Sequence, residues 1–238
     1  MAPSSAEPFD AFAPGFDRFA ELVGGPLTAY LESVFQRGER AVDLGCGSGH
    51  HAALLAARYR QVLAVDLSQA MLRIARARRG LPGITYQQRD LRSVRADTDG
   101  TFDLVFSAYA LHHLDDLEQA LWGIRELAAP GGRVVLVDNV APRPAVPRRW
   151  FVGQAVRILA GDLLGRRRPP GEAWELFRLN THPLWLDHLV ADRFLSPAEL
   201  ARRYSQVFPG ARFTDLYRAR AMCWDVTSRA AQEPPPAP

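Results

Sequence analysis

The residues best suited to chemistry form a glycine-rich run led by an acid, Asp43-Leu44-Gly45-Cys46-Gly47-Ser48-Gly49. The run lies between a short apolar segment at 41–44 and a segment of helical spacing at 50–58. Glycines let the backbone turn tightly and approach a ligand at the positive end of a helix. A dinucleotide-binding loop, G-x-G-x-x-G, would need glycine at the position of His50. The run therefore predicts a ligand site and disfavours a nicotinamide dinucleotide.

Two further acids, Asp66 and Asp90, follow the next two apolar segments, 62–65 and 84–87. A carboxylate at such a strand end can accept hydrogen bonds from both hydroxyls of a ribose, or from the edge of an adenine. Each acid alone could instead be a helix cap. Three acids after three successive strands favour a ligand that contains a nucleoside.

The elements that must position these acids alternate regularly along the chain. We predict strands at 41–44, 62–65, 84–87, 102–107 and 133–137, and helices at 50–58, 68–79 and 115–127. Ser68 is the expected N-cap of the second helix, and Ser196 caps a later one that runs to about residue 207. Segments 212–217 and 220–226 are so close in sequence that they must form an antiparallel hairpin. This alternation predicts an α/β fold with a doubly wound, mostly parallel sheet.

Composition and charge exclude several classes of protein. The 29 basic residues are all arginine, which is typical of a GC-rich genome, so we expect a bacterial source. The net charge is only +3. Such a small excess does not predict binding to nucleic acid. The two cysteines, Cys46 and Cys223, cannot form a disulfide framework. No leader or spanning apolar run is evident, so we expect a cytoplasmic protein, either a monomer or a homodimer.

On these residues the chain resembles the class I S-adenosylmethionine-dependent methyltransferase superfamily, closely over residues 40–140. The motifs occur in the family's order: VDLGCGSG at 42–49, AVDLS at 64–68, RDL at 89–91, FDLVFSAYALHHL at 102–114 and LAAPGGRVVLVDN at 127–139. The resemblance implies a seven-stranded sheet with a reversed C-terminal strand and S-adenosylmethionine as cofactor. S-adenosylhomocysteine would be the product.

The resemblance also implies roles for individual residues. Around the methionine end of the cofactor it places Asp43, Gly45, Cys46, Gly47, Gly49, Ser107 and Ala108. Asp66 would bind the ribose, and the adenine would lie near Leu67, Met71, Asp90 and Leu91. Upstream, the aromatic-acid pair Phe16-Asp17 lies where relatives close a segment over the cofactor.

The domain organisation follows from this resemblance and from where the alternation stops. We expect disordered tails at 1–15 and 231–238, and a Rossmann-like core at 16–140. A helical lid at 141–194, with helices at 150–164 and 172–180, would cover the substrate after strand five. A closing helix and hairpin would occupy 195–230. The lid's arginines and apolar residues could instead form an amphipathic helix on a membrane surface, but a lid is the more usual arrangement.

Several methyl acceptors are disfavoured, which leaves a small molecule methylated at O, N or C. The motifs of DNA and of protein-arginine methyltransferases are absent after strand four. Asp138-Asn139 matches part of the magnesium site of catechol-type enzymes, but a third acid is replaced by Ala108, so we expect no metal. The lid favours an apolar or aromatic acceptor.

Histidines are the candidate general bases, because an unperturbed imidazole titrates near physiological pH. His113, with His112, follows strand four, while His182 and His188 lie in the lid near Trp185 and Asp187. We expect catalysis by His113, His182 or His188, and acceptor contacts from Tyr109, His112, Asn139 and Trp185. Packing beside the cofactor, or a solvated helix face, are the structural alternatives for these histidines.

Two other functions remain open. The chain could bind S-adenosylmethionine with its transferase activity lost or redirected, for example to cyclisation. A nicotinamide oxidoreductase is the third candidate, and His50 argues against it.

Overall fold

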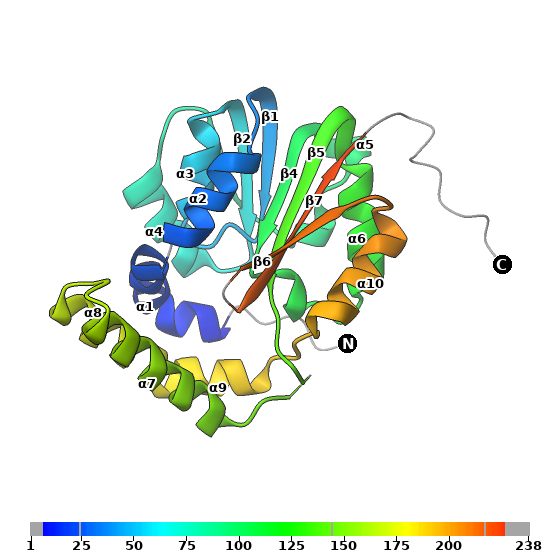
Figure 1. Ribbon diagram of the computed structural model, residues 1–238. Helices are drawn as coiled ribbons and strands as arrows, with labels where there is room; N and C mark the ends of the chain where they lie inside the picture. Colours follow the sequence, from blue (N-terminus) through cyan, green and yellow to red (C-terminus); the bar gives the residue numbers. More distant parts are fainter. Residues whose placement is uncertain (1–6, 24, 144, 217, 227–238) are drawn as a thin grey trace.

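A seven-stranded sheet forms the centre of the computed structural model, which describes residues 7–23, 25–143, 145–216 and 218–226 (Figure 1). The strands are β1 (Gly38–Leu44), β2 (Tyr59–Asp66), β3 (Ile84–Gln88), β4 (Phe102–Ala108), β5 (Ala128–Asn139), β6 (Arg212–Leu216) and β7 (Ala219–Asp225). Their order is β3-β2-β1-β4-β5-β7-β6, and β1 to β5 are parallel. Strand β7 runs antiparallel to both of its neighbours, β5 and β6. The predicted doubly wound sheet with a reversed C-terminal strand is confirmed.

Helices cover both faces of the sheet, and a further group lies beneath the carboxyl ends of its parallel strands (Figure 1). The helices are α1 (Glu7–Val23), α2 (Gly25–Val34), α3 (His50–Ala56), α4 (Gln69–Arg79), α5 (Ala96–Asp99), α6 (Leu117–Glu126), α7 (Arg148–Leu164), α8 (Pro170–Asn180), α9 (Pro183–Ala191) and α10 (Pro197–Val207). Two short 3-10 turns follow β3 and β4, η1 (Leu91–Ser93) and η2 (Leu111–His113). Helices α2, α3 and α4 pack on one face, and α6 and α10 on the other.

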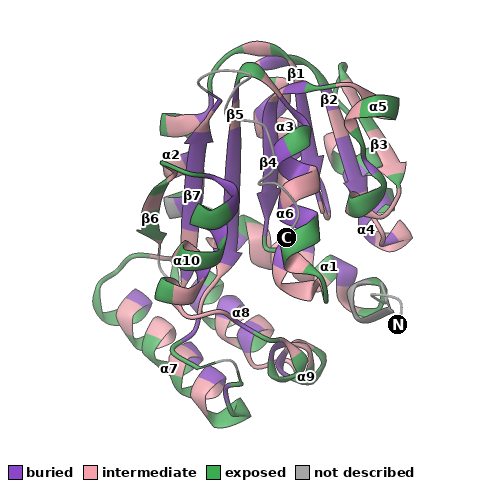
Figure 2. Cartoon of the chain, turned by 90° about the vertical axis from the view of Figure 1, so that its right-hand side faces the viewer, coloured by how far each residue is buried: buried purple, intermediate pink, exposed green. Residues whose placement is uncertain are grey.

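Burial explains why the strands form where the sequence predicts them. The apolar residues of β1, β4 and β5 are buried between the two helical layers (Figure 2), as expected for strands covered on both faces. The two predicted caps are confirmed: Ser68 accepts a hydrogen bond from Met71 N, and Ser196 accepts one from Glu199 N.

Strand β5 begins at Ala128, five residues before the predicted start at Arg133. Gly131 adopts a left-handed φ of 77°, and the pairing with β4 shifts between Phe102 and Leu104. The glycines therefore form an irregularity within β5, whereas the predicted strand began only after them.

The segment after β5 holds three helices, α7, α8 and α9, where the sequence predicted two. Helices α7 and α9 form a third apolar core, in which Phe151 and Leu186 are buried, and α8 and α9 pack against α1. Helix α1 begins at Glu7, so the expectation of disorder over residues 1–15 is wrong for residues 7–15. The tail predicted at 231–238 lies outside the described residues.

Candidate functional site

The glycine loop lies at the point where the strand order reverses, between β1 and β4, which is where open α/β sheets bind ligands. Gly45 and Gly49 adopt left-handed φ values of 79° and 83°. A Cβ at Gly45 would lie 2.5 Å from Cβ of Ala110, and one at Gly49 would lie 2.5 Å from the Tyr86 hydroxyl. Both positions therefore require glycine, and the backbone of the loop lies close to the end of β4.

Asp43 is the most unusual acid of this loop, because its side chain is buried without a partner. The residue is 1% exposed, and neither carboxylate oxygen has a hydrogen-bond partner among the described residues. Burial, together with the nearby charge of Asp66, raises the pKa of Asp43 to about 8. Buried polar groups are normally hydrogen-bonded, so this carboxyl group points to a ligand. A cationic group at this position would satisfy it.

The loop is held to Asp66 through the backbone. The Asp66 carboxylate accepts hydrogen bonds from Gly47 N and Ser68 N, both at 2.8 Å. Gly45 N and Cys46 N donate to the carbonyl of Val65 at 2.9 Å. Burial raises the pKa of the Asp66 carboxyl group. Burial also raises the pKa of the Cys46 thiol, so this cysteine is suited to packing rather than reaction.

Leu67 and Met71, which are expected beside the adenine, lie just before α4 and in its first turn. Met71 is buried, and its Cε lies 3.2 Å from where a Cβ of Gly47 would be. The carbonyl of Leu67 accepts a hydrogen bond from Gln88 Nε2.

In this structure Asp90 is the N-cap of η1. A cap was the alternative role that the sequence analysis gave for each of these acids. Its carboxylate accepts a hydrogen bond from Arg92 N at 2.8 Å and pairs with the Arg92 guanidinium. The interaction with Arg92 lowers the pKa of Asp90. Leu91, the first residue of η1, packs partly buried against the core. An adenine contact by Asp90 stays a prediction.

The end of β4 faces the glycine loop. Ser107 is fully buried and donates a hydrogen bond to the carbonyl of Leu44 at 2.7 Å, which ties β4 to β1. Ala108 ends the strand, and Tyr109 then adopts a left-handed φ of 58°. The chain turns sharply there and presents η2, which carries His112 and His113.

Three histidines and two aspartates meet below η2. Asp192, the residue after α9, lies 3.3 Å from His113 Nδ1 and 3.5 Å from both His112 Nε2 and His188 Nε2. The other ring nitrogen of His112, Nδ1, pairs with Oδ1 of Asp138 at 2.5 Å. The sequence analysis did not include Asp192. Asp187, the acid that it noted near the lid histidines, instead pairs with Arg148 on the surface.

The charges in this cluster differ from residue to residue. Burial alone would lower the pKa of His112, but the carboxylates of Asp138 and Asp192 raise it to about 10. For His188, burial and the neighbouring histidines outweigh Asp192 and lower the pKa to about 4. Burial opposes ionisation of Asp192, yet His112 and His113 hold its pKa well below the usual range.

Aromatic rings from α1 and α9 pack together beside this cluster. Trp185 lies 4.9 Å from Phe16 and 5.4 Å from Phe19, and it stacks on His188 (ring centroids). His182 stacks on Phe12 at 4.6 Å. The Nε1 of Trp185 and the Nδ1 of His182 are buried without a hydrogen-bond partner among the described residues. The structure thus brings His113 and His188 together around Asp192, while His182 lies against α1.

A cavity of about 240 Å³ lies on the other side of His112. Its polar lining includes His112, Asp138, Asn139, Arg193 and Arg203. The backbone N–H of Asn139 donates to Asp138 at 2.8 Å. His112 and Asn139, two of the predicted acceptor contacts, therefore line one cavity.

Asp17 links α1 to the glycine loop. Its carboxylate is 1% exposed and pairs with Arg78, with Arg79 at 2.7 Å and with His50 at 3.1 Å. Arg79 also donates to the carbonyl of Ser48 at 2.9 Å. The aromatic-acid pair at 16–17 thus contacts two parts of the site, because Phe16 packs on α9 and Asp17 faces the glycine loop.

The chain's fold and site together resemble those of a class I S-adenosylmethionine-dependent methyltransferase domain. Its glycine loop and successive acids lie at the carboxyl ends of β1, β2 and β3. The buried Asp43 carboxyl group, which has no side-chain hydrogen-bond partner among the described residues, fits a cofactor that carries a cationic amino group. Residues 42–136 match the family described as "Methyltransferase domain". S-adenosylmethionine is the cofactor of this class.

Individual relatives agree with this assignment. An uncharacterized methyltransferase of Mycobacterium tuberculosis is 37% identical over 115 residues, which cover 48% of this chain and 58% of that protein. A malonyl-[acyl-carrier protein] O-methyltransferase of Halorhodospira halophila is 40% identical over 53% of this chain and 45% of its own length. The chain thus spans about half the length of these curated relatives.

Solved structures share the fold over most of the chain. The DhpI–SAH complex has a TM-score of 0.63 at 21% identity, with 93% of this chain and 95% of that chain covered. The [4+2]-cyclase SpnF has a TM-score of 0.56 at 18% identity, with 88% and 73% covered. Among the described residues, no helix has the length and apolar character needed to cross a membrane.

Proposed function

We propose that the protein transfers the methyl group of S-adenosylmethionine to a small-molecule acceptor at O, N or C. The observation that carries this proposal is the buried Asp43 carboxyl group at the strand edge where this class binds its cofactor. Its oxygens have no side-chain hydrogen-bond partner among the described residues. The amino group of the methionine moiety would satisfy it. Gly45, Gly47 and Gly49 allow the close approach that such a ligand needs.

The cofactor would lie across the ends of β1, β2 and β3, with its methionine end near Ser107 and Ala108. Asp66 would bind the ribose, and Leu67, Met71, Asp90 and Leu91 would surround the adenine. The sulfonium supplies a good leaving group, so the protein's own residues mainly align the acceptor and exclude water.

The acceptor would bind between η2 and α9. An aromatic or apolar molecule is supported by the ring packing of Trp185 with Phe16 and Phe19. For an acceptor that carries a proton, His113 and His188 are candidate bases next to Asp192, which can orient them. His182 is the third candidate, because its Nδ1 is buried and has no hydrogen-bond partner among the residues that the structure describes. Tyr109, His112 and Asn139 would line the approach from β4 and β5.

Cofactor binding provides the first test. In calorimetry, S-adenosylhomocysteine should bind the purified protein and NAD should not. Replacing Asp66 by alanine should weaken S-adenosylhomocysteine binding by ~1–3 kcal/mol, the cost of leaving polar partners unpaired. The matched control is Asp97→Ala, because Asp97 is a well-exposed acid on α5. Unchanged affinity in a folded Asp66→Ala variant would show that Asp66 does not bind the ribose.

A second function, cofactor binding with redirected chemistry, is favoured by the shared fold of the [4+2]-cyclase SpnF. Product analysis separates the two functions. Methyl transfer requires equal amounts of methylated product and S-adenosylhomocysteine from labelled S-adenosylmethionine. An acceptor that is converted without formation of S-adenosylhomocysteine would support the redirected activity.

A further inference from the structure

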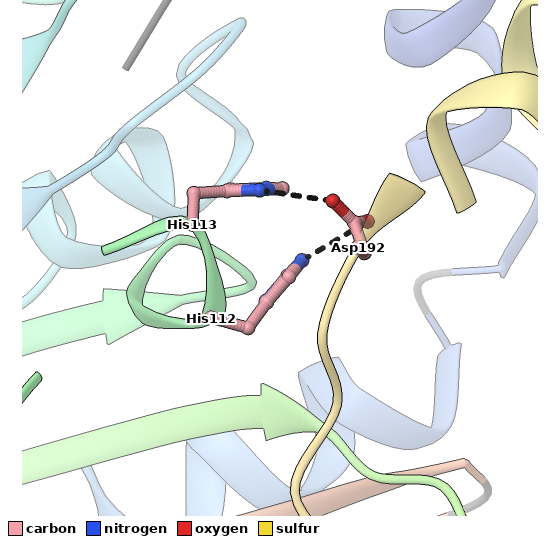
Figure 3. Close-up of side chains that lie close together, drawn as sticks. All are labelled: His112, His113 and Asp192. Atoms are coloured by element: carbon pink, nitrogen blue, oxygen red, sulfur yellow. Dashed lines mark ion pairs between the residues drawn. The ribbon is translucent and has the colours of Figure 1, made fainter. Parts of the chain in front are cut away.

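We propose that His112, His113 and Asp192 form a binding site for a divalent transition-metal ion of the zinc type. The three side chains converge from two separate parts of the chain (Figure 3). His112 and His113 come from η2, and Asp192 follows α9. Their ligand atoms all lie within 4.8 Å of one another. The ion would therefore join the core to the helices that follow β5.

The distances between these atoms match those between metal ligands. In a tetrahedral zinc site with bonds of about 2.0–2.1 Å, neighbouring ligand atoms lie about 3.3 Å apart. Here Asp192 lies 3.3 Å from His113 Nδ1 and 3.5 Å from His112 Nε2. Oδ2 of Asp192 is buried and accepts no hydrogen bond from the described residues. The carboxylate thus faces three imidazole nitrogens at 3.3–3.5 Å, which is longer than the usual charge-assisted hydrogen bond.

Asp138 supplies the outer partner that metal-bound histidines usually have. It pairs with Nδ1 of His112, which leaves Nε2 directed at Asp192. Such carboxylate–histidine pairs fix the ring and its tautomer for metal binding. The side chains are also protected from solvent, with 5% exposure for His112 and 8% for Asp192.

A second cluster in the molecule, Asp17, Glu21 and His50, gives a useful contrast. Two guanidinium groups, those of Arg78 and Arg79, already neutralise its acids. Among the described residues, Asp192 forms ion pairs with histidines alone, and these can lose their protons and bind a metal, which arginines cannot do. A bound cation is therefore needed less at Asp17 than at Asp192.

The ligand set selects the kind of ion. Two imidazoles and one carboxylate suit zinc and its neighbours, whereas magnesium prefers oxygen ligands. We expected no metal because the magnesium-type site at Asp138-Asn139 has Ala108 where its third acidic ligand would be. The present site uses other residues. With three protein ligands, a fourth position stays open for water or for an oxygen of the acceptor.

Ion binding does not depend on the proposed methyl transfer, so the two can be tested separately. Chelator-treated protein should bind one Zn²⁺ per chain in calorimetry, and Co²⁺ should give a visible absorption band of tetrahedral type without thiolate charge transfer. His112→Ala and Asp192→Asn should each remove this binding, and Asp138→Asn should weaken it ~10–100-fold. Asp187→Asn and His50→Ala are the controls and should leave it unchanged.

Binding that persists in the folded His112→Ala and Asp192→Asn variants, or that disappears with His50→Ala, would overturn the assignment, as would no binding by the wild-type protein. If neither variant folds, Zn²⁺ binding by the His113→Gln variant decides the question. The side chain of His113 is 21% exposed, so this mild change should leave the protein folded. S-adenosylhomocysteine titrated into the same samples reports on the cofactor site independently.

Discussion

At the scale of single residues, Asp43 is buried beside the charge of Asp66, and its pKa is raised to about 8. The carboxyl group is therefore mostly protonated at pH 7 in the free protein. Because its folded pKa lies above its usual value, Asp43 favours the folded state at low pH. That contribution is lost as the pH rises from about 4 to 8.

Cofactor binding should therefore release a proton. The ammonium group of the methionine moiety would lower the pKa of Asp43, since a nearby opposite charge favours the ionised form. At pH 7 we expect release of close to one proton per S-adenosylhomocysteine bound. Calorimetric titrations in two buffers of different ionisation enthalpy measure this number.

The Asp43→Asn variant is the control, because it keeps the shape and cannot ionise. Its binding should be weaker and independent of buffer ionisation enthalpy. If the wild-type protein releases no proton at pH 7, then Asp43 either is already ionised or does not meet the ammonium group.

Sequence reasoning identified the glycines and the acids at the strand ends, because spacing in sequence determines where a strand ends. It failed at Asp192 for a geometric reason. His188 and Asp192 are four residues apart and share one face of the α9 turn, whereas Asp187 points to the surface and pairs with Arg148. Without the position of α9 relative to η2, the sequence could not show which acid faces the histidines.

At the scale of elements, α1 was the main error of the sequence analysis. A Pro- and Ala-rich start indicated disorder, but Phe12, Phe16 and Phe19 recur at helical spacing and pack on α9. The strands were predictable because they are buried on both faces. Residues 183–191 were harder to predict, since a helix of nine residues is too short to show a clear helical period.

Helix α1 should be held mainly by Asp17. Asparagine at this position removes the buried anion that Arg78, Arg79 and His50 share. The two arginines keep only the more exposed Glu21 as an acidic partner. Breaking such a buried pair typically costs about 3–5 kcal/mol. Because Arg78 is half exposed, we expect Asp17→Asn to reduce the free energy of unfolding by roughly 2–3 kcal/mol in urea titrations.

The matched control is Glu175→Gln, which removes the ion pair between α8 and Arg18 of α1. Both side chains of that pair are well exposed, so the loss should be no more than about 1 kcal/mol. Equal effects of the two substitutions would mean that Asp17 has no special part in holding α1.

At the scale of the whole molecule, residues 141–194 lie beneath the carboxyl ends of the strands and should behave as a lid. We expect α7, α8 and α9 to become more protected from hydrogen exchange when S-adenosylhomocysteine and an acceptor bind. Protection of α3 and α4 should need the cofactor alone, since these helices flank the glycine loop.

Anionic vesicles provide the comparison for the lid. If α7 and α8 become protected by vesicles and show no response to cofactor and acceptor, the arginine-rich segment is a membrane-surface element instead. The exposed side chains of Leu163, Leu164 and Trp174 would then be the first to respond.

The two sets of contacts made by α1 also bear on the timing of turnover. One side of this helix holds the glycine loop through Asp17, and another packs on α9 through Phe16. A movement of α9 would therefore be transmitted through α1 to the glycine loop. If the acceptor enters by such a movement, we expect its exchange to be coupled to that of the cofactor rather than independent of it.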